Sequence, residues 1–214
     1  MKNLSSIQAL IFDLDNTLVS SKLNFKLLRN LLNCPDRIDI LDFIKAMKSA
    51  LSMKKANDFI VSHELLDALT SSFLPGSKSL LSFTAEHKYP TGIVTRNCQQ
   101  AAKIKLKKNA INVDILITRE DYPAKPNPEA LISIARLWGI DCQNIVYVGD
   151  HFYDVQAANN AGMISCLITH NMELSFKDRA HLVFNDLHEL ENALKKSQPV
   201  MESGQPYDSI KWLH

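Results

Sequence analysis

The sequence predicts an α/β protein in which one helical segment interrupts an open parallel sheet. From Pro90 onward, short apolar runs alternate with helical patterns. Such alternation is typical of parallel strands joined by right-handed crossover helices. Another apolar run, at about 7–13, predicts a first strand near the N-terminus. Between Leu18 and Leu74 the alternation is lost and apolar residues recur at helical spacing, which predicts an all-helical insertion after the first strand.

The elements after Pro90 follow from their apolar patterns. The predicted strands are about 91–95, 113–117, 144–149, 164–168 and 181–184. The predicted helices are about 97–108, 128–138, 152–161 and 186–195. Gly139 and Gly162 stand where two of these helices would end, a position that favours glycine because it adopts left-handed backbone without strain.

The insertion predicts two apolar helix faces. The first consists of Ile40, Ile44, Met47 and Leu51, and the second of Phe59, Leu66, Leu69 and Phe73. Leu74-Pro75-Gly76 marks the return to the main domain. We therefore predict a catalytic core of residues 1–17 and 75–196, a helical cap of residues 18–74 and a tail of residues 197–214. The tail is predicted to be irregular, and its apolar end, Ile210, Trp212 and Leu213, is a candidate for docking on the body or on a partner.

Composition excludes several classes of protein. The 214 residues carry a net charge of +1, so no basic excess indicates nucleic-acid binding. The lysine run in the predicted helix 97–108 is interpreted as a solvated face; it comprises Lys103, Lys105, Lys107 and Lys108. The four cysteines lack CxxC spacing and fit a reducing compartment. We find no signal peptide and no apolar stretch long enough for a membrane span, so we expect a cytoplasmic protein.

Four polar motifs occur in a fixed order along the chain. They are Phe12-Asp13-Leu14-Asp15-Asn16-Thr17, Gly92-Ile93-Val94-Thr95, Ala124-Lys125-Pro126-Asn127-Pro128 and Gly149-Asp150-His151-Phe152-Tyr153-Asp154. The first, second and fourth motifs end apolar runs that are predicted to be buried strands. The carboxyl ends of parallel strands share one edge of the sheet, where ligands bind. We therefore expect the motifs to converge on one site.

These residue types permit metal-assisted phosphoryl transfer. Asp13 and Asp15 lie so close that their carboxylates repel unless a cation or a proton holds them, and Mg²⁺ favours oxygen ligands. One carboxylate can attack phosphorus, while a second can protonate the leaving oxygen and activate water. Lys125 is a cation suited to phosphoryl oxygens. Each motif alone also fits a simpler interpretation, such as a solvated Asp-x-Asp turn or a helix N-cap at Asp150. The ordered combination favours the catalytic interpretation.

The combined motifs resemble the haloacid dehalogenase superfamily, in the branch of phosphoglycolate-phosphatase-like hydrolases with a small helical cap. The matching segments are 12–19, 92–97, 125–129, 149–154, 154–158 and 161–163. The resemblance covers nearly everything from residue 7 to about 195. It implies a Rossmann-like core under the cap. Ser20 stands where the family often has an acidic residue, and Arg96 separates Thr95 from Asn97, so substrate specificity does not transfer.

The resemblance also implies roles for individual residues. Asp13 would be the nucleophile, Asp15 the general acid and base, and Lys125 a third catalytic residue. The residues implied for binding the substrate phosphate are Thr95, Arg96, Asn97 and Lys125. Those implied for Mg²⁺ are Asp13, Asp15 through its main-chain carbonyl, Asp150, and Asp154 in a direct or supporting position.

The expected function is therefore a Mg²⁺-dependent phosphatase, acting on a small phosphorylated metabolite through an aspartyl phosphate. The alternatives are a sugar phosphomutase of the same superfamily and, from another class, a phospho-accepting signalling or binding protein. A signalling receiver needs neither a cap nor a second aspartate two residues after the nucleophile. Neither nucleic acid nor membrane is expected as a partner, and the protein is expected to be a monomer or a homodimer.

Overall fold

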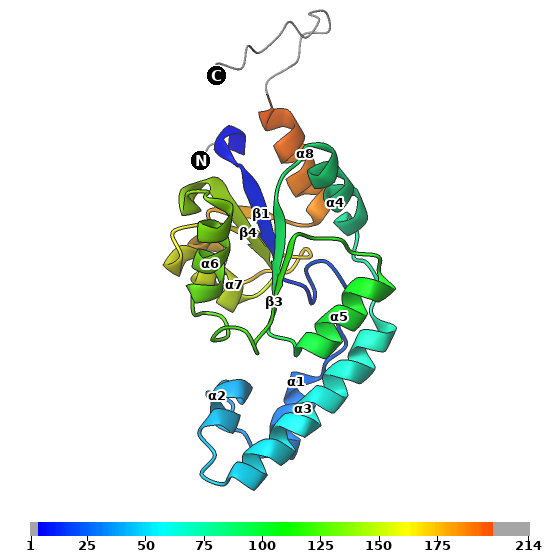
Figure 1. Cartoon of the computed structure of the whole chain (residues 1–214), viewed down its shortest axis with the longest axis vertical. Coiled ribbons are helices and arrows are strands. Elements are labelled where there is room, and N and C mark those ends of the chain that lie inside the picture. The colour runs from blue at the N-terminus through cyan, green and yellow to red at the C-terminus, as the bar shows by residue number, and fades with distance from the viewer. Residues whose placement is uncertain (1–3, 199–214) are drawn as a thin grey trace, which may run out of the picture.

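A parallel sheet forms the centre of the computed structural model, which describes residues 4–198 (Figure 1). The strands in this part of the chain are β1 (Ala9–Phe12), β2 (Thr91–Val94), β3 (Ile115–Ile117), β4 (Ile145–Gly149), β5 (Ile164–Ile168) and β6 (Leu182–Phe184). Their order is β3-β2-β1-β4-β5-β6, and every neighbouring pair is parallel. The prediction of an open parallel α/β sheet is confirmed.

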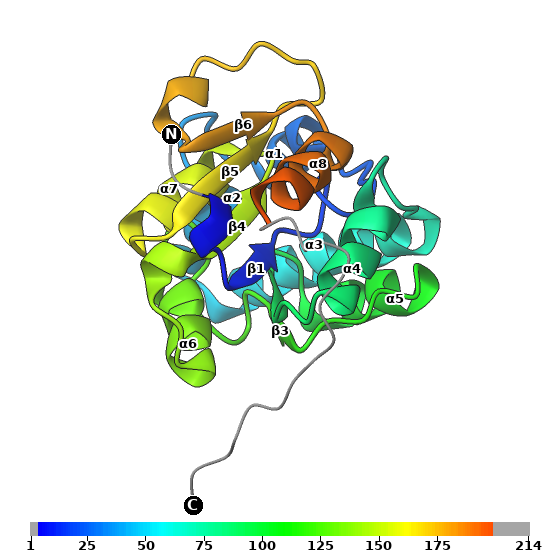
Figure 2. The same cartoon turned by 90° about the horizontal axis from the view of Figure 1, so that it is seen from above.

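Helices cover both faces of the sheet (Figure 2). One face carries α4 (Ser77–Glu86), α5 (Gln99–Lys108) and α8 (Leu187–Ser197), and the other carries α6 (Glu129–Trp138) and α7 (Phe152–Asn160). Short 3₁₀ helices occur at Leu4–Ser6, Cys142–Asn144 and Lys177–Arg179. Strand β1 alternates between the two apolar cores: Leu10 and Phe12 face one, and Ala9 and Ile11 face the other. Helix α4 was not predicted from the sequence, because the predicted alternation of strands and helices begins only at Pro90.

The helical insertion lies beyond the carboxyl edge of the sheet (Figure 1). It consists of α1 (Phe25–Leu32), α2 (Ile40–Lys45) and α3 (Ala50–Thr70). Asp39 and Ser49 accept hydrogen bonds from free N–H groups at the starts of α2 and α3, which defines where these helices begin. The insertion has an apolar core of its own, formed by Leu28, Cys34, Ile40, Ile44, Ala56 and Ile60. We refer to α1–α3 and their connections as the cap.

The apolar faces predicted for the cap are wrong in part. Leu51, Leu66 and Leu69 are 63%, 65% and 61% exposed. Helix α3 instead buries Ala56, Ile60, Glu64, Asp67 and Ala68. The C-terminal half of α3 packs against α5 of the core, where buried cations pair with Glu64 and Asp67. Because Glu64 and Asp67 are charged, a prediction based on apolar residues places this face of α3 in solvent.

The chain enters and leaves the cap at adjacent points. The main-chain N–H of Ser20 donates to Ser72 O at 2.8 Å, and that of Leu74 donates to Leu18 O at 3.0 Å. Gly76 then turns the chain with a φ of +83°, and a Cβ there would collide with the main chain of His188. The predicted docking residues Ile210, Trp212 and Leu213 lie outside the described residues. Within residues 4–198, no helix is both long and apolar enough to span a bilayer.

Candidate active site

The ends of three neighbouring strands meet at one edge of the sheet. Asp13 follows β1, Thr95 follows β2 and Asp150 follows β4, and β1 pairs with both other strands. These residues, together with Lys125 and the cap, line a cavity of about 440 Å³. The structure therefore brings together the four motifs that the sequence singled out, as expected for the crevice of a parallel sheet.

Three carboxylates form an acidic cluster in this cavity. Asp13, Asp150 and Asp154 each place an oxygen within 4.8 Å of the others. Burial, together with the neighbouring carboxylates, raises the pKa of Asp13 to about 7 and that of Asp150 to about 8. Such a cluster is costly when fully ionised, and a divalent cation removes the repulsion. The donors are oxygens, which are the ligands that Mg²⁺ favours, so the residues present fit the expected metal.

Lys125 lies beside the acidic cluster and is buried. Its ammonium is 2.7 Å from Asp13 Oδ1, 2.6 Å from Asp154 Oδ1 and 2.8 Å from the Tyr147 hydroxyl. Burial alone would lower the pKa of Lys125, but Asp13 and Asp154 outweigh it and raise the pKa above its ordinary value. The lysine is therefore a fixed positive charge next to Asp13. Tyr147, on β4, was missed by the sequence analysis because an apolar strand pattern gives no sign of a polar tip reaching the site.

A close approach of helix α7 to strand β4 positions Asp154. The carboxylate accepts a hydrogen bond from the main-chain N–H of His151 at 2.9 Å, and His151 is itself the N-cap of α7. A side chain at Gly149 would collide with that of Asp154, so only glycine fits there. The Thr17 hydroxyl donates to Asp150 Oδ1 at 3.0 Å and holds the second carboxylate in place.

Asp15 points away from the acidic cluster toward Thr95 and Asn97. Asn97 Nδ2 donates to Asp15 Oδ2 at 2.9 Å and to the Thr95 hydroxyl at 2.9 Å. The main-chain N–H of Asn97 also points at the Thr95 hydroxyl, at 3.2 Å. The side chain of Asp15 is not part of the acidic cluster found among residues 4–198. The two aspartates of the first motif therefore lie in different surroundings.

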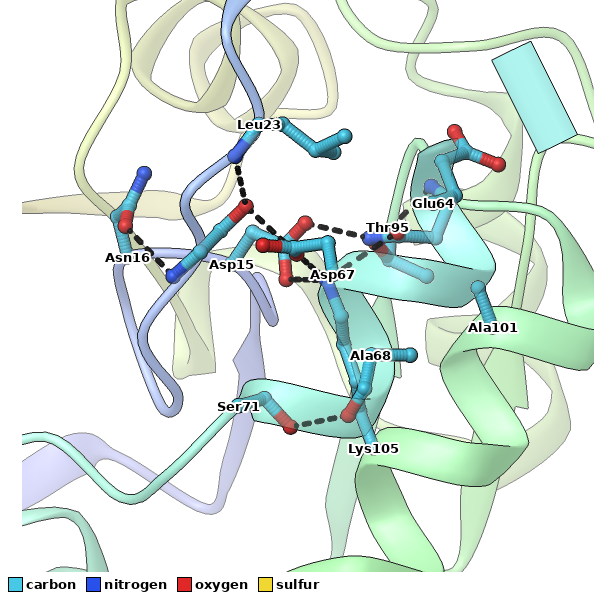
Figure 3. Close-up of polar contacts among 12 residues, drawn as sticks. Asp15, Asn16, Leu23, Glu64, Asp67, Ala68, Ser71, Thr95, Ala101 and Lys105 are labelled. Atoms are coloured by element: carbon cyan, nitrogen blue, oxygen red, sulfur yellow. Dashed lines mark hydrogen bonds and ion pairs between the residues drawn. The ribbon is translucent and has the colours of Figure 1, made fainter. Parts of the chain in front are cut away.

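Lys105 corrects the interpretation of the lysine run as a solvated face. Its side chain is fully buried, and its ammonium pairs with Asp15 and, at 2.8 Å, with Asp67 of the cap (Figure 3). Asp67 also accepts hydrogen bonds from the Ser21 hydroxyl at 2.9 Å and from the Lys22 N–H at 2.6 Å. One signal in the sequence marked this lysine: it lies four residues after Ala101, on the buried side of the same helix.

Arg96 connects the core to the cap. Its guanidinium is 2.6 Å from Asp39 Oδ2, also donates to the main-chain oxygen of Lys125, and lies 4.8 Å from the centre of the Tyr153 ring. Arg96 lines the cavity, as expected for a phosphate-binding residue, but its donors already have protein partners. A phosphoryl group would have to replace Asp39.

Comparisons with known proteins agree with this geometry. Residues 10–168 match the family described as haloacid dehalogenase-like hydrolase, so the chain belongs to that family. An uncharacterized hydrolase of Saccharomyces cerevisiae is 28% identical over 203 residues, which cover 89% of this chain and 92% of that protein. Pyrophosphatase PpaX of Bacillus velezensis is 29% identical over 177 residues, covering 73% of this chain and 80% of that protein. The crystal structure of a predicted phosphoglycolate phosphatase from Haemophilus somnus has a TM-score of 0.66 at 20% identity, covering 90% of this chain and 99% of that one.

The family match confirms the predicted superfamily and the prediction of an enzyme, a hydrolase. The likeness to the Haemophilus somnus structure confirms the predicted fold, a Rossmann-like core with parallel strands.

Proposed function

We propose that this haloacid dehalogenase-like hydrolase is a Mg²⁺-dependent phosphatase that cleaves a small phosphorylated metabolite through an aspartyl phosphate. One observation carries the proposal: Asp13 lies at a strand end between a buried lysine and two further carboxylates, inside a cavity of about 440 Å³. A cavity of this size suits a small molecule.

The proposed reaction has two steps. The Asp13 carboxylate attacks phosphorus, the P–O bond to the alcohol breaks, and Asp15 donates a proton to the departing oxygen. Asp15 then takes a proton from water, and that water attacks the phosphoryl group and releases inorganic phosphate and free Asp13. The separate surroundings of the two aspartates support this division of labour, because Asp13 faces the acidic cluster and Lys125, whereas Asp15 faces Lys105 and Asn97.

The proposed metal ligands are Asp13, the main-chain carbonyl of Asp15 and Asp150, with Asp154 in support. Bound Mg²⁺ would neutralise negative charge shared by the carboxylates and the phosphoryl group. Asp154 also holds Lys125 in place through the 2.6 Å ion pair. In the proposal, Lys125, the Thr95 hydroxyl and the Asn97 N–H bind phosphoryl oxygens, and Arg96 joins them on leaving Asp39.

The test is phosphate release from a panel of small phosphate esters, with and without Mg²⁺, followed by trapping of the covalent intermediate in acid. We expect release that requires Mg²⁺, inhibition by Ca²⁺ because its larger and looser shell displaces the attacking carboxylate, and an acid-stable phosphate label on Asp13. Full activity in excess chelator would overturn the metal role. Isomerised sugar phosphate in place of free phosphate would identify a phosphomutase, and a phosphoaspartate that persists without turnover would identify a signalling protein.

A further inference from the structure

The wall of the cavity opposite the acidic cluster is formed by the cap and is largely apolar. The apolar cap side chains that line the cavity are Leu23, Phe25, Leu28, Ile40, Leu41 and Ile60. Leu28, Ile40 and Ile60 also belong to the apolar core of the cap, so packing holds them in place. The group attached to the phosphate would therefore meet a preformed apolar surface.

The charged residues on the same wall already have protein partners, although Arg29 has main-chain oxygens and no carboxylate. Arg29 donates to the main-chain oxygens of Pro35 at 2.9 Å and Ile38 at 2.6 Å. Asp39 pairs with Arg96. Glu64 pairs with Arg119 and accepts from the Cys98 N–H at 3.1 Å.

Among the described residues that line the cavity, Lys125 and Arg96 are the cations proposed to bind the phosphoryl group itself, and both belong to the core rather than to the cap. The His151 ring accepts a hydrogen bond from the main-chain N–H of Tyr153 at 3.2 Å. A second anion on the substrate would face the apolar wall and the carboxylates of Asp39 and Glu64, and Arg29, the cap cation that lines the cavity, already donates to two main-chain oxygens, so burial of that anion is unfavourable.

We infer that the substrate is a phosphate monoester of an uncharged, largely apolar alcohol, and that the cap wall selects against a second anionic group. This inference rests on the proposed phosphatase function and adds the class of leaving group to it.

Two esters of matched size test the inference: isobutyl phosphate and 2-phosphoglycolate, which have the same number of non-hydrogen atoms beyond the bridging oxygen. We expect kcat/KM with Mg²⁺ to favour isobutyl phosphate by at least ~10-fold. Equal or better use of phosphoglycolate would overturn the inference and leave the phosphatase proposal standing. No phosphate release from any ester, p-nitrophenyl phosphate included, would overturn both.

A pair of variants links this preference to the cap wall. Phe25→Lys places a cation in the cavity at a residue that is 58% exposed and so tolerates charge. Leu27→Lys adds the same charge to the same helix, at a 45% exposed residue outside the cavity lining. We expect Phe25→Lys to move the preference toward phosphoglycolate by about 10-fold and Leu27→Lys to leave it unchanged. An equal shift in both variants, or none in Phe25→Lys, would contradict a role for the wall.

A different observation supports a second inference, about Lys105. This buried ammonium contacts Asp15 on one side and Asp67 of α3 on the other (Figure 3). Asp67 in turn accepts hydrogen bonds from Ser21 and Lys22, where the chain enters the cap. The ammonium is fully buried, so undocking α3 would remove one of its two carboxylate partners without a protein replacement.

We infer that Lys105 is a positioning residue: it holds the Asp15 carboxylate in its catalytic orientation while the cap is docked. The inference rests on the proposed role of Asp15. It predicts that losing Lys105 impairs proton donation to the leaving group more than it impairs attack on phosphorus.

Two leaving groups separate these steps. p-Nitrophenolate departs without taking up a proton, whereas the isobutyl oxygen must be protonated as it departs. We expect Lys105→Gln to lower kcat for isobutyl phosphate by ~10- to 100-fold, since proton transfer by a positioned group is worth about 10²–10⁴-fold, with a much smaller loss for p-nitrophenyl phosphate. Lys105→Arg, which keeps the charge, should recover part of the selective loss.

Arg119→Gln is the matched control. It removes another cation that pairs with α3 but does not contact Asp15, and it should affect both esters alike. Equal losses of both esters in Lys105→Gln, or a selective loss in Arg119→Gln, would overturn the inference; if Lys105→Gln does not fold, Lys105→Arg compared with Arg119→Gln decides by the same ratio.

Discussion

The sheet edge and the cap helix α3 both bury carboxylates, but they balance the charge differently. At the sheet edge, Asp13, Asp150 and Asp154 share a single buried lysine. On α3, Glu64 has a cation of its own in Arg119, whereas Asp67 shares Lys105 with Asp15. Burial, and after it the neighbouring carboxylates, raise the pKa of Asp13 to about 7 and that of Asp150 to about 8.

The contrast separates two uses of buried charge. A surplus of carboxylates lowers the stability of the metal-free fold and creates a place for a cation. A balanced pair fastens one part of the chain to another, and it becomes costly when one partner is lost.

The largest effect is expected from Asp13→Asn. An amide does not attack phosphorus, so turnover should fall by on the order of 10⁴-fold or more, and no acid-stable phosphate should form on the protein. Steady-state assays and acid trapping measure the two effects. Asp58→Asn, at an exposed ion pair on the cap, is the control and should remain active. Near-normal turnover in Asp13→Asn would mean that another residue is the nucleophile.

Asp15→Asn should have the next largest effect. Protonation of the leaving group and activation of water both lose their catalyst, and such catalysis is worth about 10²–10⁴-fold. Rapid-quench experiments should show both slower formation and slower loss of the phosphoenzyme. A variant that slows only one of the two steps would show that Asp15 does not serve both.

Arg119→Gln tests the balanced side of the contrast. Glu64 would remain buried with the Cys98 N–H as a partner but without its cation, so we expect the free energy of unfolding to fall by about 3 kcal/mol. Urea denaturation measures the change. A loss below about 0.5 kcal/mol would place this pair with weak surface ion pairs.

Asp150→Asn tests the unbalanced side in metal-free protein, where the effect should be smaller and of opposite sign. The folded-state pKa of Asp150 is about 8, against 3.8 ordinarily, so the native state keeps a proton that the unfolded chain has lost. The free energy of unfolding of the wild type should therefore fall as pH rises from about 4 through about 8. Asparagine lacks this titration, so the variant should gain stability relative to the wild type across the same window.

Urea denaturation in EDTA at several pH values measures this difference. Added Mg²⁺ should stabilise the wild type most at the alkaline end, where the carboxylates have lost their protons, and should stabilise Asp150→Asn much less. If the difference in free energy of unfolding between the wild type and Asp150→Asn did not change with pH, the acidic cluster would not be unbalanced.

The local apolar pattern was sufficient to predict most strands and helices of the core. The strand predicted at 164–168 agrees with β5 (Ile164–Ile168), and the helix predicted at 128–138 differs by one residue from α6 (Glu129–Trp138). These elements bury continuous apolar faces, so their periodicity is visible in the sequence. Helix α4 was missed, although Leu80 and Phe83 pack on the sheet, because no predicted strand stood beside it.

The sequence by itself determined the fold class, the order of the strands and the four motifs at the carboxyl edge, because strand ends and helix starts follow from nearby residues. Only the tertiary structure decided which charges are buried together. Lys105 and Asp15 are 90 positions apart, and Glu64 and Arg119 are 55 apart. Whether a lysine is solvated or buried depends on the carboxylates that distant segments bring to it, and a local pattern contains no information about those partners.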